Sequence, residues 1–366
     1  MSFVQLFYLR FCRAVSAVTG IVLVMWAIFP VAACADTPPI SLENHESPGR
    51  NVSTEPLAEA YNYRQAVRFA DNAAMDWQHS RRCVTCHTNG MYLIARPAAG
   101  VDSPAYRDAR SFTKEYLKRY VVDHKEPRGQ RGSIEGIVAT TAFKTISDIK
   151  TTGGLDDITK TALDYIWANQ DDSGAWESWL KCHWGPYEVD DHFGVTLVAL
   201  AMGIASDDDY TRTPNAITGV KKLRSYLEAH PPSSLHQTGM ALWASSYLGG
   251  LADQATKQRW KEALFAAQKQ EGGWVLIELG NDDWQREDRK PQSRECDGYA
   301  TAFAAHVLIE SGVPREDARI AKALQWLKEH QRLSGRWYTR SPRRDGQHFI
   351  THAATNLAIL VLASEE

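Results

Sequence analysis

The chain has 366 residues, of which 44% are hydrophobic and 23% are charged, and its formal net charge is −3. These values are ordinary for a soluble globular domain. The small net charge gives no electrostatic reason to expect binding to nucleic acid or to an anionic membrane, so we expect no nucleic-acid partner.

The first 35 residues have the pattern of an export signal. Arg10 and Arg13 precede an apolar run from Ala14 to Ala33, and no acidic residue occurs before Asp36. A basic region followed by an apolar region is typical of a signal peptide. The apolar run is also nearly long enough to span a membrane.

Two processing sites overlap at the end of this run. Ala33-Cys34-Ala35 has the small-x-small form of ordinary cleavage, whereas Val31-Ala32-Ala33-Cys34 resembles a bacterial lipobox and would make Cys34 a lipidated N-terminus. An uncleaved anchor is the third alternative. Each predicts an exported protein, periplasmic or membrane-anchored, that contacts the membrane only through this segment. Residues 36–55 are rich in Pro, Ser and Asn, which predicts a flexible tether before a single domain over residues 56–366.

A C-x-x-C-H motif follows early in that domain. Cys83, Cys86 and His87 form the attachment signature of a c-type haem, with two thiols for the vinyl groups and the imidazole as proximal iron ligand. A local disulfide, half of a zinc site and coincidence are the alternatives. A haem in this position implies a redox partner.

The sixth iron ligand is open. No Met lies between Met91 and Met202, so the downstream Met of small cytochromes c is missing. His79, Met91, His124 or an open position remain. The segment is too short for an independent cytochrome domain, so a haem would pack onto the rest of the fold.

The remaining pattern is helical. Apolar residues recur at helical spacing in stretches separated by Gly and Pro, and no convincing run of alternating strand residues occurs. The expected helices cover residues 58–79, 103–123, 134–150, 155–169, 191–205, 215–229, 235–248, 254–270, 298–312, 316–330 and 350–363. This predicts an all-α fold of six helical hairpins, the C-x-x-C-H segment being an irregular first one.

Three segments share one sequence motif, Gln-x3-Gly-x-Trp. They begin at Gln170, Gln268 and Gln331, each after a helical stretch. The Gln can bond free backbone groups at a helix end, the Gly permits a tight reversal, and the Trp packs on the neighbouring repeat. Repeats of this kind bury their apolar faces against one another.

This motif closely resembles the QW repeats of squalene and oxidosqualene cyclases, and more loosely those of protein prenyltransferase β subunits. The resemblance implies an α/α toroid, in which inner and outer helices alternate around a central cavity. Those cyclases have two such domains and about twice the length, so this chain corresponds to one toroid. The twelve tryptophans fit packing between repeats and an aromatic-lined cavity. Such a cavity would take an apolar, isoprenoid or lipid-like ligand.

Polar residues gather where the inner helices are expected to begin. Alignment of these helices on one another places five side chains at equivalent positions, and equivalent positions of a toroid lie at one end. We therefore expect a ring around one mouth of the cavity, made of Asp191, His192, His236, Asp297 and His352. The alternative is that these residues cap helices, since Asp is a preferred N-cap.

An acidic turn precedes one of these helices. Glu188-Val189-Asp190-Asp191 resembles the D-x-D-D motif of class II terpenoid cyclases. The resemblance implies that Asp190 is a catalytic acid for an alkene, with Glu188 and Asp191 holding it protonated, because clustered carboxylates raise one another's pKa. The first Asp of the motif is Glu here. A capped, hydrated turn is the alternative.

Two further alternatives involve cysteines. Protein prenyltransferase β subunits bind zinc with Asp, Cys and a later His, which by resemblance points to Asp297, Cys296 and His352, although Tyr299 stands where that family has its Cys. In an oxidising compartment, a disulfide between Cys182 and Cys296 is at least as good an explanation.

Three functions follow. The first is a terpenoid cyclase-like enzyme or apolar-ligand binder with Asp190 as acid, and the second is a redox or sensory haem protein on a toroid scaffold. The third is an interaction module with neither activity.

Overall fold

Every regular element in the described part of the chain is a helix. The computed structural model describes residues 38–125, 133–176, 181–187, 189–281, 284–346 and 349–365. Glu188 and the N-terminal segment lie outside these ranges, so the predictions that concern them remain predictions. Among the described residues no helix is long and apolar enough to cross a membrane.

The long helices lie where the apolar periodicity predicts them. The helix bounds in chain order are α1 Tyr63–Arg81, a π-helix Cys86–Gly90, α2 Met91–Ala95, a 3-10 turn Arg96–Ala99, α3 Pro104–Val121, α4 Ser133–Thr152, α5 Asp157–Ala168, α6 Asp191–Ile204, a 3-10 turn Asp209–Arg212, α7 Pro214–Ala229, α8 Leu235–Tyr247, α9 Gln254–Ala266, α10 Leu276–Leu279, α11 Gly298–Glu310, α12 Ala318–Glu329, α13 Ile350–Leu362 and a 3-10 turn Ala363–Glu365.

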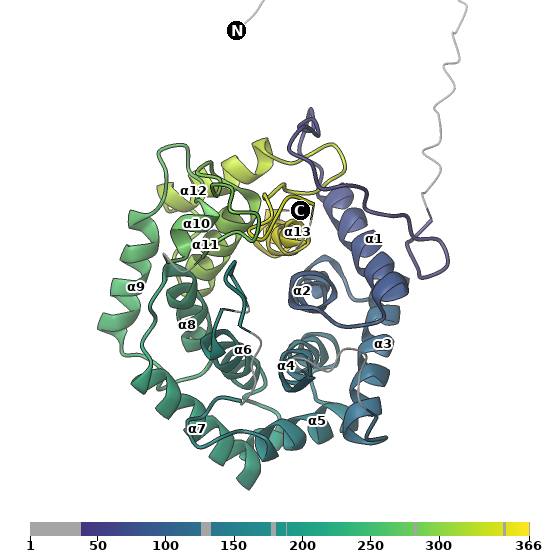
Figure 1. Ribbon diagram of the computed structural model, residues 1–366, viewed down its shortest axis with the longest axis vertical. Coiled ribbons are helices and arrows are strands. Elements are labelled where there is room, and N and C mark those ends of the chain that lie inside the picture. The colour runs from purple at the N-terminus through teal and green to yellow at the C-terminus, as the bar shows by residue number, and fades with distance from the viewer. Residues whose placement is uncertain are drawn as a thin grey trace, which may run out of the picture. The chain divides into compact units, whose positions relative to one another are not determined.

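Within the compact unit Pro39–Glu366, these helices form two concentric rings (Figure 1). The inner ring consists of α2, α4, α6, α8, α11 and α13, each in contact with the next, and α13 closes on α2. The outer ring consists of α1, α3, α5, α7, α9 and α12. Inner helices such as α6 are buried nearly all round, whereas outer helices such as α12 bury one face, as a two-layer ring requires. The all-α toroid of six hairpins is therefore confirmed.

Each Gln-x3-Gly-x-Trp segment forms the same clamp between two outer helices. The indole N–H of Trp274 donates to the carbonyl of Leu264 (2.7 Å), ten residues earlier on α9, while Gln268 donates to the Arg319 carbonyl of α12 (2.8 Å). Gly272 has φ +103°, and a Cβ there would lie 2.7 Å from the carbonyl oxygen of Lys322. Only glycine satisfies both conditions. We call this arrangement the Gln-Gly-Trp clamp, and its three copies are Gln170–Trp176, Gln268–Trp274 and Gln331–Trp337.

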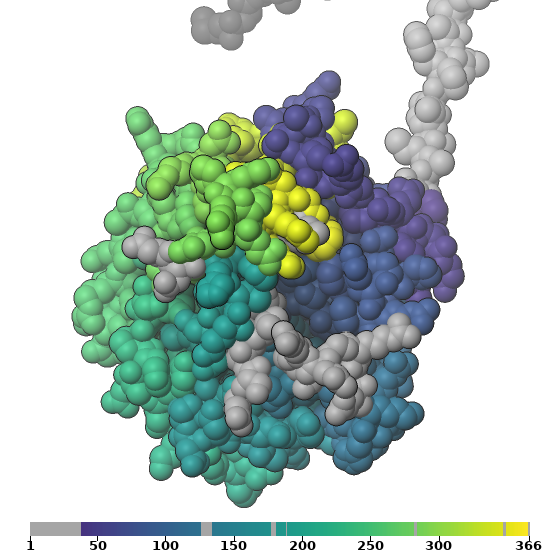
Figure 2. Space-filling view, viewed as in Figure 1, coloured from purple at the N-terminus to yellow at the C-terminus, as the bar shows by residue number. Residues whose placement is uncertain are grey.

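The third clamp closes the ring onto its beginning. Gln331 donates to the carbonyl of Asn62 (2.9 Å) and accepts from the Asn62 N–H (2.7 Å), at the start of α1. Residues 39–55, expected to be a flexible tether, belong to the compact unit: Ile40 is 3% exposed, and Glu55 pairs with the buried Arg336. Figure 2 shows these purple residues packed against the yellow C-terminal part.

The axis of the ring is closed at the level of its aromatic side chains. Residues from all six inner helices and Tyr187 leave a void of only about 10 Å³, roughly the room of one water. Phe143, Tyr299 and Phe303 are each no more than 1% exposed. This corrects the expectation of an open, aromatic-lined central cavity at this level, because large side chains on the inner helices fill it.

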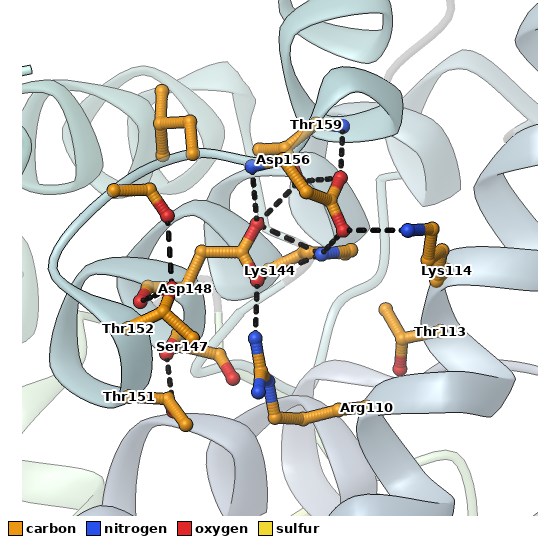
Figure 3. A network of polar contacts seen from close by, with 12 residues as sticks. Arg110, Thr113, Lys114, Lys144, Ser147, Asp148, Thr151, Thr152, Asp156 and Thr159 are labelled. Carbon is orange, nitrogen blue, oxygen red and sulfur yellow. Dashed lines mark hydrogen bonds and ion pairs between the residues drawn. The ribbon is translucent and has the colours of Figure 1, made fainter.

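The sector around α3, α4 and α5 contains buried charges in place of a clamp (Figure 3). Asp148 of α4 is fully buried and accepts from Lys144 (2.7 Å), from Arg110 of α3 (2.9 Å) and from Thr159 of α5 (2.6 Å). Lys144 also donates to Asp156, the N-cap of α5 (2.9 Å). One network thus joins three helices.

Candidate functional site at the N-terminal ends of the inner helices

The inner helices begin at one end of the ring, and their first turns are joined by polar contacts. Gln237 of α8 donates to Asp190 before α6 (2.6 Å), and His236 of α8 lies 2.8 Å from the Tyr299 hydroxyl of α11. Thr88, before α2, lies 3.1 Å from His352 of α13. This end is the mouth predicted from the sequence.

The first pocket at the mouth, the α6–α8 pocket, has a volume of about 390 Å³. It lies within the range of small-molecule sites. Asp190, His192 and His236 line it, as expected, together with Gln237 and Trp284. Its floor includes Phe193 and Met240, which also bound the small void on the ring axis.

Asp190 is both a helix cap and a pocket residue. Its Oδ1 accepts from the backbone N–H of His192 (2.9 Å), which makes it the N-cap of α6. Its Oδ2 accepts from Gln237, whose amide oxygen is in turn held by the N–H of Ser233 (2.7 Å). Burial and the neighbouring Asp191 raise the pKa of Asp190, against the lowering effect of these two donors.

The next residue, Asp191, lies beside Lys181. Burial raises the pKa of Asp191 as well, and Lys181, 3.8 Å away, opposes the shift. Its carboxylate is not among the groups that line the α6–α8 pocket. Glu188, the third member of the acidic turn, lies outside the described residues.

His192 is 3% exposed, and neither of its ring nitrogens has a hydrogen-bond partner among the described residues. Burial lowers the pKa of His192 to about 4, so the ring is neutral at pH 7. A buried imidazole that faces a pocket without a partner is costly unless a ligand or water satisfies it. Both ring nitrogens are themselves buried, so a ligand or water in the α6–α8 pocket would bond to His192 only after a shift of the ring.

His236, by contrast, is fixed by its neighbours. Besides the Tyr299 contact, its ring stacks on Phe303 with the centroids 4.6 Å apart. Burial lowers the pKa of His236 to about 3. His236 is held as a neutral, rigid part of the wall.

Two of the five residues expected to form a ring at the mouth, Asp297 and His352, lie apart from the α6–α8 pocket. Asp297 caps α11 and is 8% exposed, and its oxygens accept from the N–H groups of Ala300 (3.0 Å) and Leu276 (2.6 Å) and from the Thr339 hydroxyl (3.1 Å). Burial raises the pKa of Asp297 to about 6. His352 turns toward Thr88, away from Asp297.

The alternative zinc set is consequently not brought together. In the ranges that the structure describes, no three His, Cys, Asp or Glu side chains are placed to hold one metal ion. Asp297 is occupied by capping donors, and His352 belongs to another contact. Cys182 and Cys296 are not joined by a disulfide either. Cys296 lies beside Glu271, and burial, followed by that carboxylate, raises the pKa of its thiol.

The C-x-x-C-H segment reaches the same mouth. Cys86 and His87 begin the π-helix and are 6% and 7% exposed, while Cys83 is half-buried in the preceding loop. No disulfide joins the two cysteines. The π-helix Cys86–Gly90 contacts the inner helices α2, α4 and α13, so the motif lies beside the inner ring.

Aromatic rings and a hydroxyl hold the imidazole of His87. Trp77 contacts it edge-on at 5.1 Å between centroids, and Phe349 lies at 5.8 Å. Its Nδ1 is 2.8 Å from Thr88 Oγ1, which also lies 3.1 Å from Nδ1 of His352. Thr88 thus links the two imidazoles.

The sequence-based interpretation missed Gln237 and Thr88. Each stands next to a residue that was singled out: Gln237 follows His236, and Thr88 follows His87. Adjacency to a candidate residue at a helix start was the available signal, since such neighbours share the mouth.

The comparisons support the fold. No family model and no curated protein matches the sequence. The solved structures that match include ent-copalyl diphosphate synthase from Streptomyces platensis, at 13% identity and TM-score 0.50, over 75% of this chain and 49% of that one. They also include a wild-type glycosidase, at 12% identity and TM-score 0.53, over 83% of this chain and 96% of that one. The chain thus spans about half of the synthase. Structural similarity at such low identity shows a common fold only. The chain therefore has the α/α toroid that is also found in this synthase and this glycosidase.

Proposed function

We propose that this chain is an exported c-type haem protein, in which a terpene cyclase-like toroid is the scaffold for a redox centre. The observation that carries the proposal is the C-x-x-C-H segment at the mouth. Its two thiols are not consumed by a disulfide, and its imidazole is buried among aromatic rings. The donor set has the chemistry that haem attachment requires.

Each residue has a separate role in this proposal. Cys83 and Cys86 would hold the porphyrin through thioether bonds, formed by addition of each thiol to a vinyl group, and His87 would bind the iron. Thr88 bonds to the Nδ1 of His87, which fixes the orientation of the ring and would leave Nε2 as the nitrogen that binds the iron. A bound haem supplies one-electron transfer at its iron. Trp77 and Phe349 exclude water from the imidazole.

The test is expression of the full chain with a cytochrome c maturation system. We expect a Soret band and haem that stays with the protein on a denaturing gel. Cys83→Ser with Cys86→Ser should abolish both, whereas Cys296→Ser, a half-buried cysteine elsewhere at the mouth, should keep them. A colourless wild-type protein whose thiols at 83 and 86 are unmodified by mass spectrometry would contradict the proposal.

A second candidate function, acid–base chemistry in the α6–α8 pocket, has a specific observation in its favour. Asp190, whose pKa is raised, and His192, which is neutral and without a protein partner, line the same pocket. The pocket admits a compact ligand, whereas the closed axis beneath it has no room for a long polyprenyl chain. Asp190 serves as the acid on such a ligand and His192 as its hydrogen-bonding partner.

Incubation of the purified protein with C5–C30 isoprenoids and with oligosaccharides tests this second function. The oligosaccharides are included because one toroid of matching extent is a glycosidase. Asp190→Asn keeps a good N-cap but cannot donate a carboxylic proton. Product from the wild type, and none from Asp190→Asn with an unchanged melting temperature, is the expected result. Absence of product from the wild type would remove the acid role and leave Asp190 as a cap.

A further inference from the structure

Thr88 connects two buried imidazoles, and the second of them faces a large pocket. His352 is 7% exposed and lines a cavity of about 980 Å³ at the mouth. Its Nδ1 bonds to Thr88, and among the described residues no protein group bonds to its Nε2. A nearly buried polar group that faces a cavity in this way calls for a partner there.

The lining of this cavity favours an anion. Three guanidinium groups, of Arg50, Arg294 and Arg340, line it against two carboxylates, of Glu295 and Asp345. Arg340 is paired with Asp345 (2.9 Å). Guanidinium groups bind oxyanions with two parallel hydrogen bonds. The remaining two arginines and the free N–H of a neutral His352 therefore suit a small oxyanion, a carboxylate or a phosphate.

The hydroxyl of Thr88 couples the proton positions of the two rings. It has one proton to donate and accepts through its lone pairs. If Nδ1–H of His87 donates to Thr88 Oγ1, the hydroxyl is free to donate to Nδ1 of His352. This arrangement leaves a lone pair on Nε2 of His87, as metal binding requires, and a proton on Nε2 of His352, which can be donated into the cavity.

We propose that the 980 Å³ cavity is an oxyanion site and that His352 and Thr88 relay its occupancy to His87. An anion that accepts from Nε2–H makes His352 a stronger acceptor at Nδ1. Thr88 then accepts more strongly from His87, whose Nε2 becomes more basic. A more basic His87 would stabilise the ferric state of a bound haem, so an occupied cavity would lower its reduction potential. For this readout the inference rests on the proposed haem.

The shift in reduction potential and the change in anion affinity are linked thermodynamically. If the anion lowers the potential, the ferric protein must bind the anion more tightly than the ferrous protein does. Tenfold tighter binding corresponds to a shift of about 59 mV for a one-electron couple. His352 and Thr88 are positioning residues here, since neither touches the iron.

The experiment is a redox titration of the haem-loaded full chain in phosphate, in acetate and in chloride at equal ionic strength. We expect phosphate or acetate to lower the potential relative to chloride, and the stronger of the two identifies the preferred anion. Thr88→Val should keep the Soret band and lose the shift, while Thr88→Ser, which retains the hydroxyl, should keep the shift. Arg294→Gln should raise the anion concentration needed, whereas Arg344→Gln, outside the cavity lining, should not.

A potential that saturating phosphate and acetate leave unchanged would overturn the relay, as would a shift that persists in Thr88→Val. If the protein contains no haem, the proposed function fails, and the relay is read instead from the ¹⁵N chemical shifts of His87 in the haem-free chain. Phosphate should move these shifts in the wild type and not in Thr88→Val. Unchanged wild-type shifts would then reject the inference independently.

Discussion

Neighbouring outer helices are joined in two different ways. Between α9 and α12, as between α5 and α7 and between α12 and α1, a Gln-Gly-Trp clamp supplies an indole N–H, an amide and a close backbone approach. Between α3 and α5, the connection is made by two charged side chains of α4, the buried carboxylate of Asp148 and the ammonium group of Lys144. One region is joined by neutral hydrogen bonds from a short sequence motif, and the other is joined by charged side chains from three helices.

The difference lies in what a single substitution leaves behind. Loss of a neutral donor in a clamp leaves one carbonyl unsatisfied, which costs about 1–3 kcal/mol. Loss of one charge in the network leaves an opposite charge buried, which costs about 3–5 kcal/mol. A single substitution should therefore destabilise the protein more in the charged sector than in a clamp.

The largest expected effect is that of Lys144→Met. Lys144 is 3% exposed, and its loss leaves Asp148, fully buried, with Arg110 as its remaining charged partner. We expect a loss of about 3–5 kcal/mol in the free energy of unfolding, measured by urea denaturation. Adding Asp148→Asn to Lys144→Met should recover part of this loss, because the fully buried side chain at position 148 is then neutral, and Arg110, which loses its ion pair, is partly exposed. A single variant within about 1 kcal/mol of the wild type would contradict the proposed fragility.

A smaller effect is expected for Trp274→Phe in a clamp. The change removes the bond from the indole N–H to the Leu264 carbonyl, and Leu264 is fully buried. The expected cost is about 1–3 kcal/mol in the same urea experiment. Trp326→Phe is the matched control, since the buried Trp326 indole N–H has no hydrogen-bond partner in the part of the chain that the structure describes. Equal costs for both variants would show that ring volume, and not the clamp bond, is responsible.

The two regions should also differ in their response to acid. Burial alone would raise the pKa of Asp156, but the Lys144 ammonium and the Thr159 N–H lower it overall. A carboxyl whose folded-state pKa is depressed contributes stability above its unfolded pKa of about 4 and loses it as pH falls further. The Gln, Gly and Trp residues that make each clamp contact do not titrate. Melting temperatures at pH 5 and pH 3 should therefore differ less for Asp156→Asn, which still caps α5, than for the wild type. An unchanged difference would exclude Asp156 as a cause.

Whether a contact could be predicted from the sequence depends on how far apart its residues lie along the chain. The clamps were predictable because Gln268, Gly272 and Trp274 are local, and their repetition gave the toroid. The network was not, since Arg110 and Thr159 reach Asp148 from other helices and nothing in their spacing reveals the meeting. Only Lys144 and Asp148, four residues apart, are readable as a helical pair.

The candidate site follows the same rule. Asp190, His192 and His236 line one pocket as expected, because equivalent helix starts in a repeat lie at one end. The direction of each side chain was not predictable. His352 turns to Thr88 and faces a different pocket, and large aromatic side chains close the axis that the resemblance to cyclases had suggested was open.

The smallest expected effect separates one clamp from another. Gln331 is 1% exposed, donates to the carbonyls of Asn62 and Gly335, and accepts from the Asn62 N–H. Gln268 is partly exposed and makes two bonds, both as donor. Because each net hydrogen bond contributes about 0.5–1.5 kcal/mol, Gln331→Leu should destabilise the protein by about that much more than Gln268→Leu. The extra bond belongs to the contact between the last and the first hairpin. If the two variants unfold at the same urea concentration, the closing clamp is no stronger than an internal one, and other contacts at the closure, such as the Glu55–Arg336 pair, hold the ring shut.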